Sequence, residues 1–350
     1  MSLIEKKGYY KRNFFLGCII LVMAILVATY VGVANISLKQ TSLIILNKIP
    51  VLGKYIDLGN IKSTSSIIIL NVRLPRVIMA AIIGAGLSVS GASFQALFKN
   101  PMADPYILGV SSGAALGATI AMLLGLGTTF LGFSFITLAA FLGAITTTLI
   151  VYSIARVGNK VPNITLLLAG IAMTFLLSSI ISLIMIFKRD QIENIVMWTM
   201  GSVSTASWSQ VKLLMPFTIV GIIIIFLFSR DLNIMLLGDD TAKNLGIEVD
   251  KVRKILLFIC TVLVAGIVSV SGIIGFIGLI IPHIVRIIFG VNYRTVILFS
   301  ALYGSIFLIF CDTIARTIVD PMEIPVGIVT SIFGVPFFMY LLYKAKKKGL

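Results

Sequence analysis

The chain has 350 residues, of which 59% are hydrophobic and only 12% are charged. Soluble globular domains carry about 25% charged residues, so this composition excludes a protein that folds mainly in water. The formal net charge is +15 at pH 7. No basic stretch has the interleaved aromatics or fold signature of a nucleic-acid-binding protein, so the positive charge is interpreted as a determinant of membrane orientation.

The hydrophobic residues gather in about ten continuous runs, each close to the roughly 20 residues that a helix needs to cross a bilayer. Runs without apolar–polar alternation exclude a transmembrane barrel, and helices satisfy their own backbone groups in lipid. The predicted fold class is an all-α polytopic membrane protein, whose short eighth run is a candidate for a broken helix. The predicted spans are 14–34, 74–97, 106–125, 130–155, 164–187, 211–229, 253–273, 276–289, 296–315 and 325–343.

The first apolar run follows a basic segment and is too long for the core of a signal peptide, which predicts an uncleaved first span. Placing both termini in the cytoplasm puts the larger share of the 28 lysines and arginines on the inner side. The prediction is therefore a multi-pass protein of the inner (cytoplasmic) membrane. It has one transmembrane domain over residues 1–350, with its helical bundle at 14–343.

Residues 73–76 read Arg-Leu-Pro-Arg and open the second predicted span on its outer side. Arg73 and Arg76 would oppose the helix dipole there, because a helix N-terminus favours anions. Two interpretations remain open. The arginines snorkel to the interface, or they bind carboxylates of an external partner, which a guanidinium group grips bidentately.

Small residues recur within the spans. Ser-Val-Ser-Gly occurs at 88–91 and again at 269–272, in spans that run in opposite directions, and a proline follows each copy ten residues later. Inverted repeats are common in transporters. Glycines also recur in the second and third spans, where they let helix backbones approach closely or flank a pathway that opens.

The polar segment that begins at the inner end of the second span carries Gln95, Asn100, Pro101 and Asp104. A residue that precedes proline is pushed out of the α region, so the chain is expected to turn here. Asn and Asp can also cap the next helix. These residues are candidates either for a structural turn or for the lining of a pathway.

Residues 229–254 form the longest charged segment on the predicted cytoplasmic side. Asp239, Asp240 and Thr241 can cap a short helix at 241–245, which Gly246 can end. Apolar residues beside this helix have no obvious reason to face water unless they lie on the bilayer or meet a partner. The residues in question are Leu236, Leu237, Leu245 and Ile247.

The last outer loop and the span before it carry Asp312, Arg316, Asp320 and Glu323. Asp312 and Arg316 are four residues apart and can pair along one helix face. A charge inside a span costs about 2.5–3.5 kcal/mol on insertion scales, so pairing or a wet cavity is expected. His283, the single histidine, follows Pro282 and is interpreted as structural.

The sequence carries no signature of a chemical catalyst. It has no G-x-x-x-x-G-K-[ST] phosphate loop, no H-E-x-x-H motif and no Ser/His/Asp cluster. The three cysteines lie inside apolar runs without the spacing of a metal site, and small buried hydrophobes are expected there. The chain is predicted to be neither an enzyme nor a metalloprotein, and to need no cofactor.

In these polar segments the sequence resembles the FecCD-type permease subunits of bacterial ABC importers for iron–siderophores, haem and vitamin B12. The matching stretches follow the order of the family, whereas the outer segment 35–66 has no match. The stretches are 73–114, 166–173, 236–247, 271–290 and 323–338.

The resemblance implies a ten-helix subunit, like the vitamin B12 importer permease, that pairs with itself or a paralogue around a translocation path. Two cytoplasmic ATPase subunits and an extracytoplasmic substrate-binding protein are the implied partners. Segment 229–254 becomes a cytoplasmic coupling loop. The implied ATPase-coupling residues are Gly238, Asp239, Asp240, Ala242, Leu245 and Gly246. The implied docking residues for the binding protein are Arg73, Arg76 and Arg316. The structural or pathway candidates are Gln95, Asn100, Pro101, Pro282, His283 and Asp312.

The implied function is inward transport of a ferric chelate, an iron–siderophore first, with ATP hydrolysed by separate subunits. Import of haem or a corrinoid by the same scaffold is the alternative. A secondary transporter would need coupling carboxylates in mid-membrane, for which Asp312 is the one candidate in the sequence. An intramembrane enzyme would need a catalytic cluster, which the sequence does not offer.

Overall fold

A computed structural model describes residues 3–32, 34, 36–48, 53–55, 61–126, 129–130, 133–156, 158, 161–319 and 322–347. Over these residues, seven helical runs are long and apolar enough to cross a membrane, and three shorter apolar helices accompany them. Together they stand at the ten predicted positions, which confirms the all-α membrane fold. The helices at these positions are α1 (Leu3–Tyr30), α4 (Leu74–Leu97), α5 (Val110–Leu123), α6 (Phe135–Ala155), α7 (Asn163–Phe187), α9 (Trp208–Leu227), α12 (Val249–Ser271), α13 (Ile277–Phe289), α14 (Tyr293–Ala315) and α15 (Val326–Lys347).

Short elements connect the long helices. Two strands of two residues each pair antiparallel between α5 and α6, with Thr129 opposite Ser134. The remaining elements are α2 (Leu38–Asn47), η1 (Gly53–Tyr55), α3 (Ser63–Ile67), η2 (Ile68–Arg73), η3 (Pro105–Leu108), β1 (Thr129–Phe130), β2 (Phe133–Ser134), η4 (Arg189–Gln191), α8 (Ile192–Thr199), α10 (Ser229–Met235) and α11 (Asp239–Asn244).

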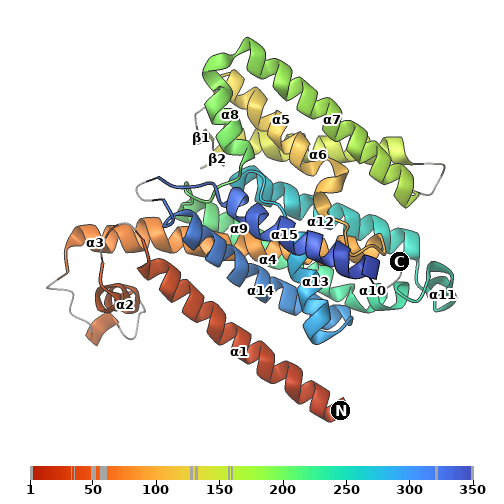
Figure 1. Ribbon diagram of the computed structural model, residues 1–350, viewed down its shortest axis with the longest axis horizontal. Coiled ribbons are helices and arrows are strands. Elements are labelled where there is room, and N and C mark those ends of the chain that lie inside the picture. The colour runs from red at the N-terminus through yellow and green to blue at the C-terminus, as the bar shows by residue number, and fades with distance from the viewer. Residues whose placement is uncertain are drawn as a thin grey trace.

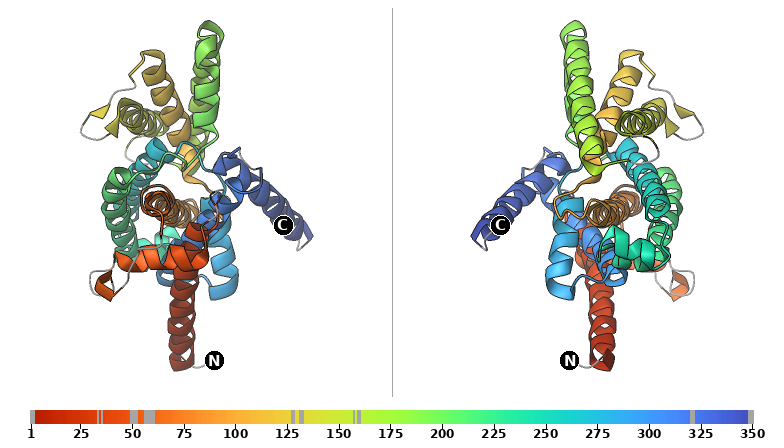
Figure 2. Two further views of the ribbon diagram at one scale, coloured as in Figure 1. Left: turned by 90° about the vertical axis from the view of Figure 1, so that its left-hand side faces the viewer. Right: turned by 90° about the vertical axis from the view of Figure 1, so that its right-hand side faces the viewer.

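Helix α4 forms the centre of the bundle and is buried along nearly its whole length. Helices α1, α9, α12, α13 and α14 pack around it, while α5, α6 and α7 form a second layer (Figure 1). Views along the bundle show α1, α7 and α15 projecting from this centre in different directions (Figure 2). We call the end that carries α11 and both termini the inner end, and the end that carries α2 the outer end.

Glycines allow the central helices to touch. A Cβ atom added to Gly84 of α4 would lie 2.2 Å from the carbonyl oxygen of Gly304 on α14. A Cβ atom on Gly91 would lie 2.1 Å from the carbonyl oxygen of Gly278 on α13. Ser88 donates a hydrogen bond of 2.8 Å to the carbonyl oxygen of Ser300 across the first of these contacts. Close backbone approach through small residues, the packing interpretation of the glycines, is therefore what the structure contains.

The second span begins earlier than expected. Helix α3 and the π-helix η2 run into α4 without a break, so one helical run covers Ser63–Leu97. Arg73 and Arg76 therefore lie inside a helix, and the prediction that they open one is wrong. Proline favours the first turn of a helix, but Pro75 stands inside this helical run. The wide π turn just before it supplies backbone geometry that tolerates a residue without an N–H group.

The eighth predicted span is a broken element, as its length suggested. Helix α12 ends at Ser271, and α13 has only 13 residues. Between them the chain turns at Gly272 and Phe276, which have φ values of +67° and +69°.

The unmatched outer segment 35–66 contains α2, whose Ser37 and Gln40 form a reciprocal capping box.

Candidate functional site

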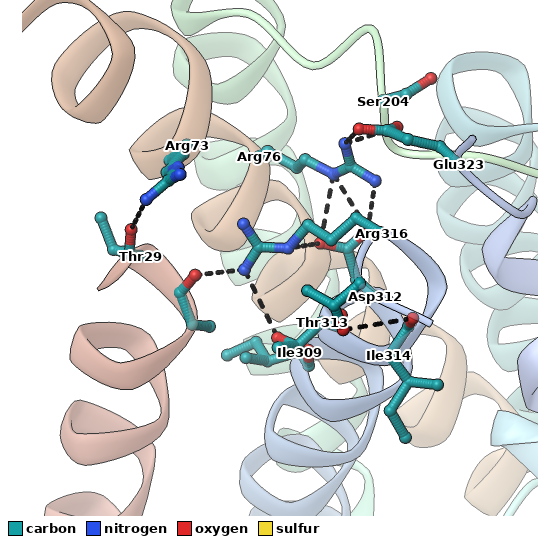
Figure 3. Close-up of polar contacts among 12 residues, drawn as sticks. Thr29, Arg73, Arg76, Ser204, Ile309, Asp312, Thr313, Ile314, Arg316 and Glu323 are labelled. Atoms are coloured by element: carbon teal, nitrogen blue, oxygen red, sulfur yellow. Dashed lines mark hydrogen bonds and ion pairs between the residues drawn. The ribbon is translucent and has the colours of Figure 1, made fainter. Parts of the chain in front are cut away.

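Two arginines at the outer end donate hydrogen bonds to carbonyl groups at the C-terminal end of α1. The final carbonyl groups of a helix lack partners within it, and cations are favoured beside them. Arg73 donates to the carbonyl oxygens of Tyr30 and Ala34, at 2.7 Å each. Arg316 donates to the carbonyl oxygen of Ala28. Both side chains are buried, so they hold α1 against α4 and α14 (Figure 3).

Arg76 binds two carboxylates at once. Its Nε donates to both carboxylate oxygens of Asp312, at 3.0 and 3.2 Å, and its Nη2 lies 2.9 Å from Oδ1 of the same group. Its Nη1 donates to both oxygens of Glu323, at 2.9 and 2.8 Å. Arg316 Nε lies 3.7 Å from Asp312 Oδ2, which confirms the predicted pairing along α14. Asp312 lies in the last turn of α14, near the outer end and not in mid-membrane.

We call Arg73, Arg76, Arg316, Asp312 and Glu323 the outer charge cluster (Figure 3). Its two carboxylates differ in exposure: the side chain of Asp312 is 1% exposed and that of Glu323 is 44% exposed. The guanidinium groups bind partners within the chain. Docking of these arginines to an external protein therefore stays a prediction, and any docking carboxylate has to compete with a group already bound. Asp320 lies outside the described residues.

At the inner end, α10 and α11 are fixed to the bundle by their buried residues. Leu232, Met235 and Ala242 are fully enclosed. The side chain of Asn233 accepts a hydrogen bond of 2.8 Å from the backbone N–H of Tyr293, at the start of α14. Ala242, a predicted coupling residue, therefore anchors α11 and does not lie on its outer surface.

Asp239 connects α11 to two long helices. Its carboxylate lies 2.7 Å from Nζ of Lys99, just beyond α4, and 3.1 Å from Nη2 of Arg253 in α12. Partial burial would raise the pKa of Asp239, but the hydrogen bonds and charges of Lys99 and Arg253 hold that pKa below its usual value. Asp239 is thus a positioning residue, whereas Asp240 is exposed.

The helix in this loop differs from the predicted one at its start. It begins at Asp239 and not at Thr241, and Gly238 stands at the N-cap position without a side-chain hydrogen bond. The predicted capping by the aspartates is wrong, because Asp239 is committed to Lys99 and Arg253. Gly246, with φ of +83°, follows the last turn as expected for a glycine that ends a helix.

The outward face of this element is apolar. Leu236, Leu237 and Leu245 are exposed together with Asp240. Ile247 departs from the prediction, since it is half-buried and packs against the main core. We call Leu236, Leu237, Asp240 and Leu245 the inner patch.

The remaining candidates join α4 to α13. Gln95 donates to the carbonyl oxygens of Gly278 and Leu279, at 2.9 and 3.3 Å, and its own side-chain oxygen accepts from Arg286. Pro282 is buried within α13. His283 is half-buried and lies edge-on to the ring of Phe337, with ring centroids 6.4 Å apart.

The turn after α4 is held by its own side chains. The side chain of Asn100 accepts a hydrogen bond of 2.9 Å from the N–H of Met102, with the exposed Pro101 between them. Asp104 caps η3 by accepting from the N–H of Tyr106 at 2.8 Å. Burial raises the pKa of Asp104 to about 6, although that hydrogen bond acts to lower it.

Sequence reasoning did not find Lys99, Arg253 and Arg286 as partners of the candidate residues. Each is a basic residue at the inner end of a span, where positive charge is expected for orientation alone. No local spacing distinguishes Lys99 from the other inner lysines, since its partner Asp239 comes from a different part of the chain.

Comparison with known proteins places these features in a family. The model of the FecCD transport family matches residues 20–344. The cobalamin import system permease protein BtuC of Halobacterium salinarum is 39% identical over 83% of this chain and 77% of that protein. The Fe(3+)-citrate import system permease protein YfmD of Bacillus subtilis is 39% identical over 81% of this chain and 84% of that protein.

A solved structure agrees with the fold. It is described as a metal-chelate type ABC transporter in an inward-facing conformation, and it matches with a TM-score of 0.81 at 29% identity. The match covers 95% of this chain and 99% of the other. This multi-pass membrane protein therefore belongs to the FecCD transport family.

Proposed function

We propose that this chain is the permease subunit of an ABC importer that carries a ferric chelate, an iron–siderophore first, into the cytoplasm. Members of the FecCD family are transport permease subunits and not enzymes. The proposal assigns ATP hydrolysis to two separate cytoplasmic subunits. It adds a second permease subunit, identical or paralogous, and an extracytoplasmic binding protein that delivers the chelate. Both termini and the inner end then face the cytoplasm.

The observation that carries this proposal is the connection of the inner patch to the bundle. The patch offers exposed leucines and Asp240 to a partner. Directly behind it, Asp239 binds Lys99 and Arg253. A motor that moved α11 would therefore pull on α4 and α12 together. Because α4 is the centre of the bundle, that movement reaches the helices around it.

The outer charge cluster supports a specific form of docking. Arg76 is shared between buried Asp312 and exposed Glu323. A carboxylate of the binding protein can reach Arg76 only by taking the place of Glu323. In this proposal Arg73 and Arg316 contribute by fixing α1, and Arg76 is the arginine that exchanges its partner.

The coupling assignment is tested by reversing charge within and beside the inner patch. Asp240→Lys should abolish most ATP-driven uptake in vesicles that contain the full transporter, and should weaken co-purification of the ATPase. Glu248→Lys is the matched control, because Glu248 is an exposed acidic residue of the same end that lies outside the patch. If both variants transport equally well, the inner patch is not the motor contact.

A secondary transporter is the more distant alternative. Asp312 is its one candidate carboxylate from the sequence, and that group is bound by Arg76 and Arg316 near the outer end. Accumulation of chelate by vesicles that hold this chain alone, driven by an ion gradient, would replace the proposal. Haem or corrinoid import stays the alternative within the family. Mass spectrometry of the ligand carried by the co-purified binding protein decides between these substrates.

A further inference from the structure

A cavity opens between α6 and α12 toward the inner end, away from the outer charge cluster. Its volume is about 230 Å³. The two helices pack side by side in the bundle (Figure 1). The side chains that matter for the argument are Leu149 and Tyr152 from α6, and Lys254, Phe258 and Thr261 from α12.

The cavity faces the surface that lies in the bilayer. Leu149 is 56% exposed and Phe258 is 61% exposed, one on each helix that flanks the opening. Both helices are long and apolar enough to span a membrane. In a membrane, this opening meets lipid chains and not water, so an acyl chain is the occupant that the walls fit.

Two polar groups in the wall lack a partner among the described residues. Thr261 is 4% exposed, and its hydroxyl oxygen has no hydrogen-bond partner there. This oxygen has almost no accessible surface, so it is not itself a contact for a ligand in the cavity. Lys254 is exposed and forms no ion pair within the described chain.

The charge around Lys254 favours an anion. The other two basic residues of this turn are committed, since Lys251 pairs with Glu248 at 3.4 Å and Arg253 pairs with Asp239. Lys254 and Thr261 are seven residues apart, so their Cα atoms stand about 10 Å apart along the helix axis. Side chains in a helix lean toward its N-terminus, so the ammonium group of Lys254 extends toward the inner end, where lipid headgroups lie, and away from Thr261.

We propose that this cavity binds one anionic phospholipid. Its phosphate lies on Lys254, and an acyl chain fills the space between Leu149 and Phe258. The proposed function places the inner end at the cytoplasmic leaflet, which carries the anionic lipids. Only this choice of leaflet rests on the proposed function. The site itself requires no transport activity.

The test uses the full chain in bilayer nanodiscs made of equal parts of phosphatidylglycerol and phosphatidylcholine. After extraction into detergent, native mass spectrometry measures the phospholipids that stay bound. The wild type should retain phosphatidylglycerol in preference to phosphatidylcholine. Lys254→Gln should lower that preference about five-fold, the size expected for one lysine near a charged headgroup. Lys251→Gln, one turn nearer the helix start, should leave it unchanged.

A second pair of variants tests the cavity without changing charge. Leu149→Trp should fill the space and lower retention of both lipids, whereas Ile150→Trp should not, because Ile150 is similarly exposed but does not line the cavity. Equal retention of the two lipids by the wild type overturns the proposal. So does a loss that is the same in both members of either pair. The two pairs of variants are measured independently. If one variant does not fold, the other pair still tests whether the cavity binds the lipid.

Discussion

Replacing Asp312 by Asn should destabilise the protein far more than replacing Glu323 by Gln, although both carboxylates bind the same guanidinium group. The structure supplies the reason, because Asp312 is 1% exposed and Glu323 is 44% exposed at the side chain. Asp312 also sits between two buried arginines, Arg76 and Arg316. Its loss leaves two positive charges close together with a single carboxylate at the rim.

The expected magnitudes follow from the two environments. Removing one partner of a buried ion pair costs about 3–5 kcal/mol, because the other charge stays buried without compensation. An exposed ion pair contributes about 0–1 kcal/mol, since water screens it and side-chain order opposes it. Asp312→Asn should therefore lower the free energy of unfolding by several kcal/mol. Glu323→Gln should lower it by at most about 1 kcal/mol.

The assay is equilibrium unfolding of the full chain in mixed detergent, followed by circular dichroism. A double-mutant cycle that adds Arg76→Gln separates the pair from its surroundings. Asp312→Asn should cost less once Arg76 is neutral, because fewer uncompensated charges remain. Similar and small losses for Asp312→Asn and Glu323→Gln would refute the reasoning. They would show that water reaches both carboxylates.

Two further predictions concern the inner turn and the helix contacts. Burial raises the pKa of Asp104 to about 6, so this group stabilises the fold most below its unfolded pKa near 4, and that contribution is lost as the pH rises through 6. Asp104→Asn should therefore flatten the fall in melting temperature between pH 4 and pH 6, and an unchanged pH profile would contradict the assignment. Gly84→Ala should cost about 1–3 kcal/mol in unfolding experiments, because its Cβ would lie 2.2 Å from the carbonyl oxygen of Gly304. Gly275→Ala is the control, since no atom of the described residues lies within 4 Å of an added Cβ, and equal losses would argue against close packing of α4 and α14.

The span positions could be predicted because a bilayer imposes one length and one kind of backbone pairing on every crossing. The pairing of Asp312 with Arg316 could also be predicted, since it follows from helical spacing alone. The end of α11 at Gly246 follows from the conformational preference of glycine. These are local properties, and the sequence expresses each of them within a few residues.

The other partners within the outer charge cluster could not be predicted in this way. Arg76 and Asp312 are 236 residues apart, and only the packing of α4 against α14 brings them together. Contacts with α1 and the residues just after it bind Arg73 and Arg316, two of the arginines that were expected to face outward. The start of the second span was misplaced at residue 74, because the sequence does not mark the π turn through which the helix continues.

The separation of Arg76 from its carboxylates also has a consequence for how the protein is made. At about 5–20 residues per second, the 236 residues between Arg76 and Asp312 take about 12–47 s to synthesise. During that interval the second span has to reside in the membrane with Arg76 lacking its counter-ions. Arg76 can bind Asp312 only after the ninth span has been inserted. The contacts of the outer end therefore form near the end of translation.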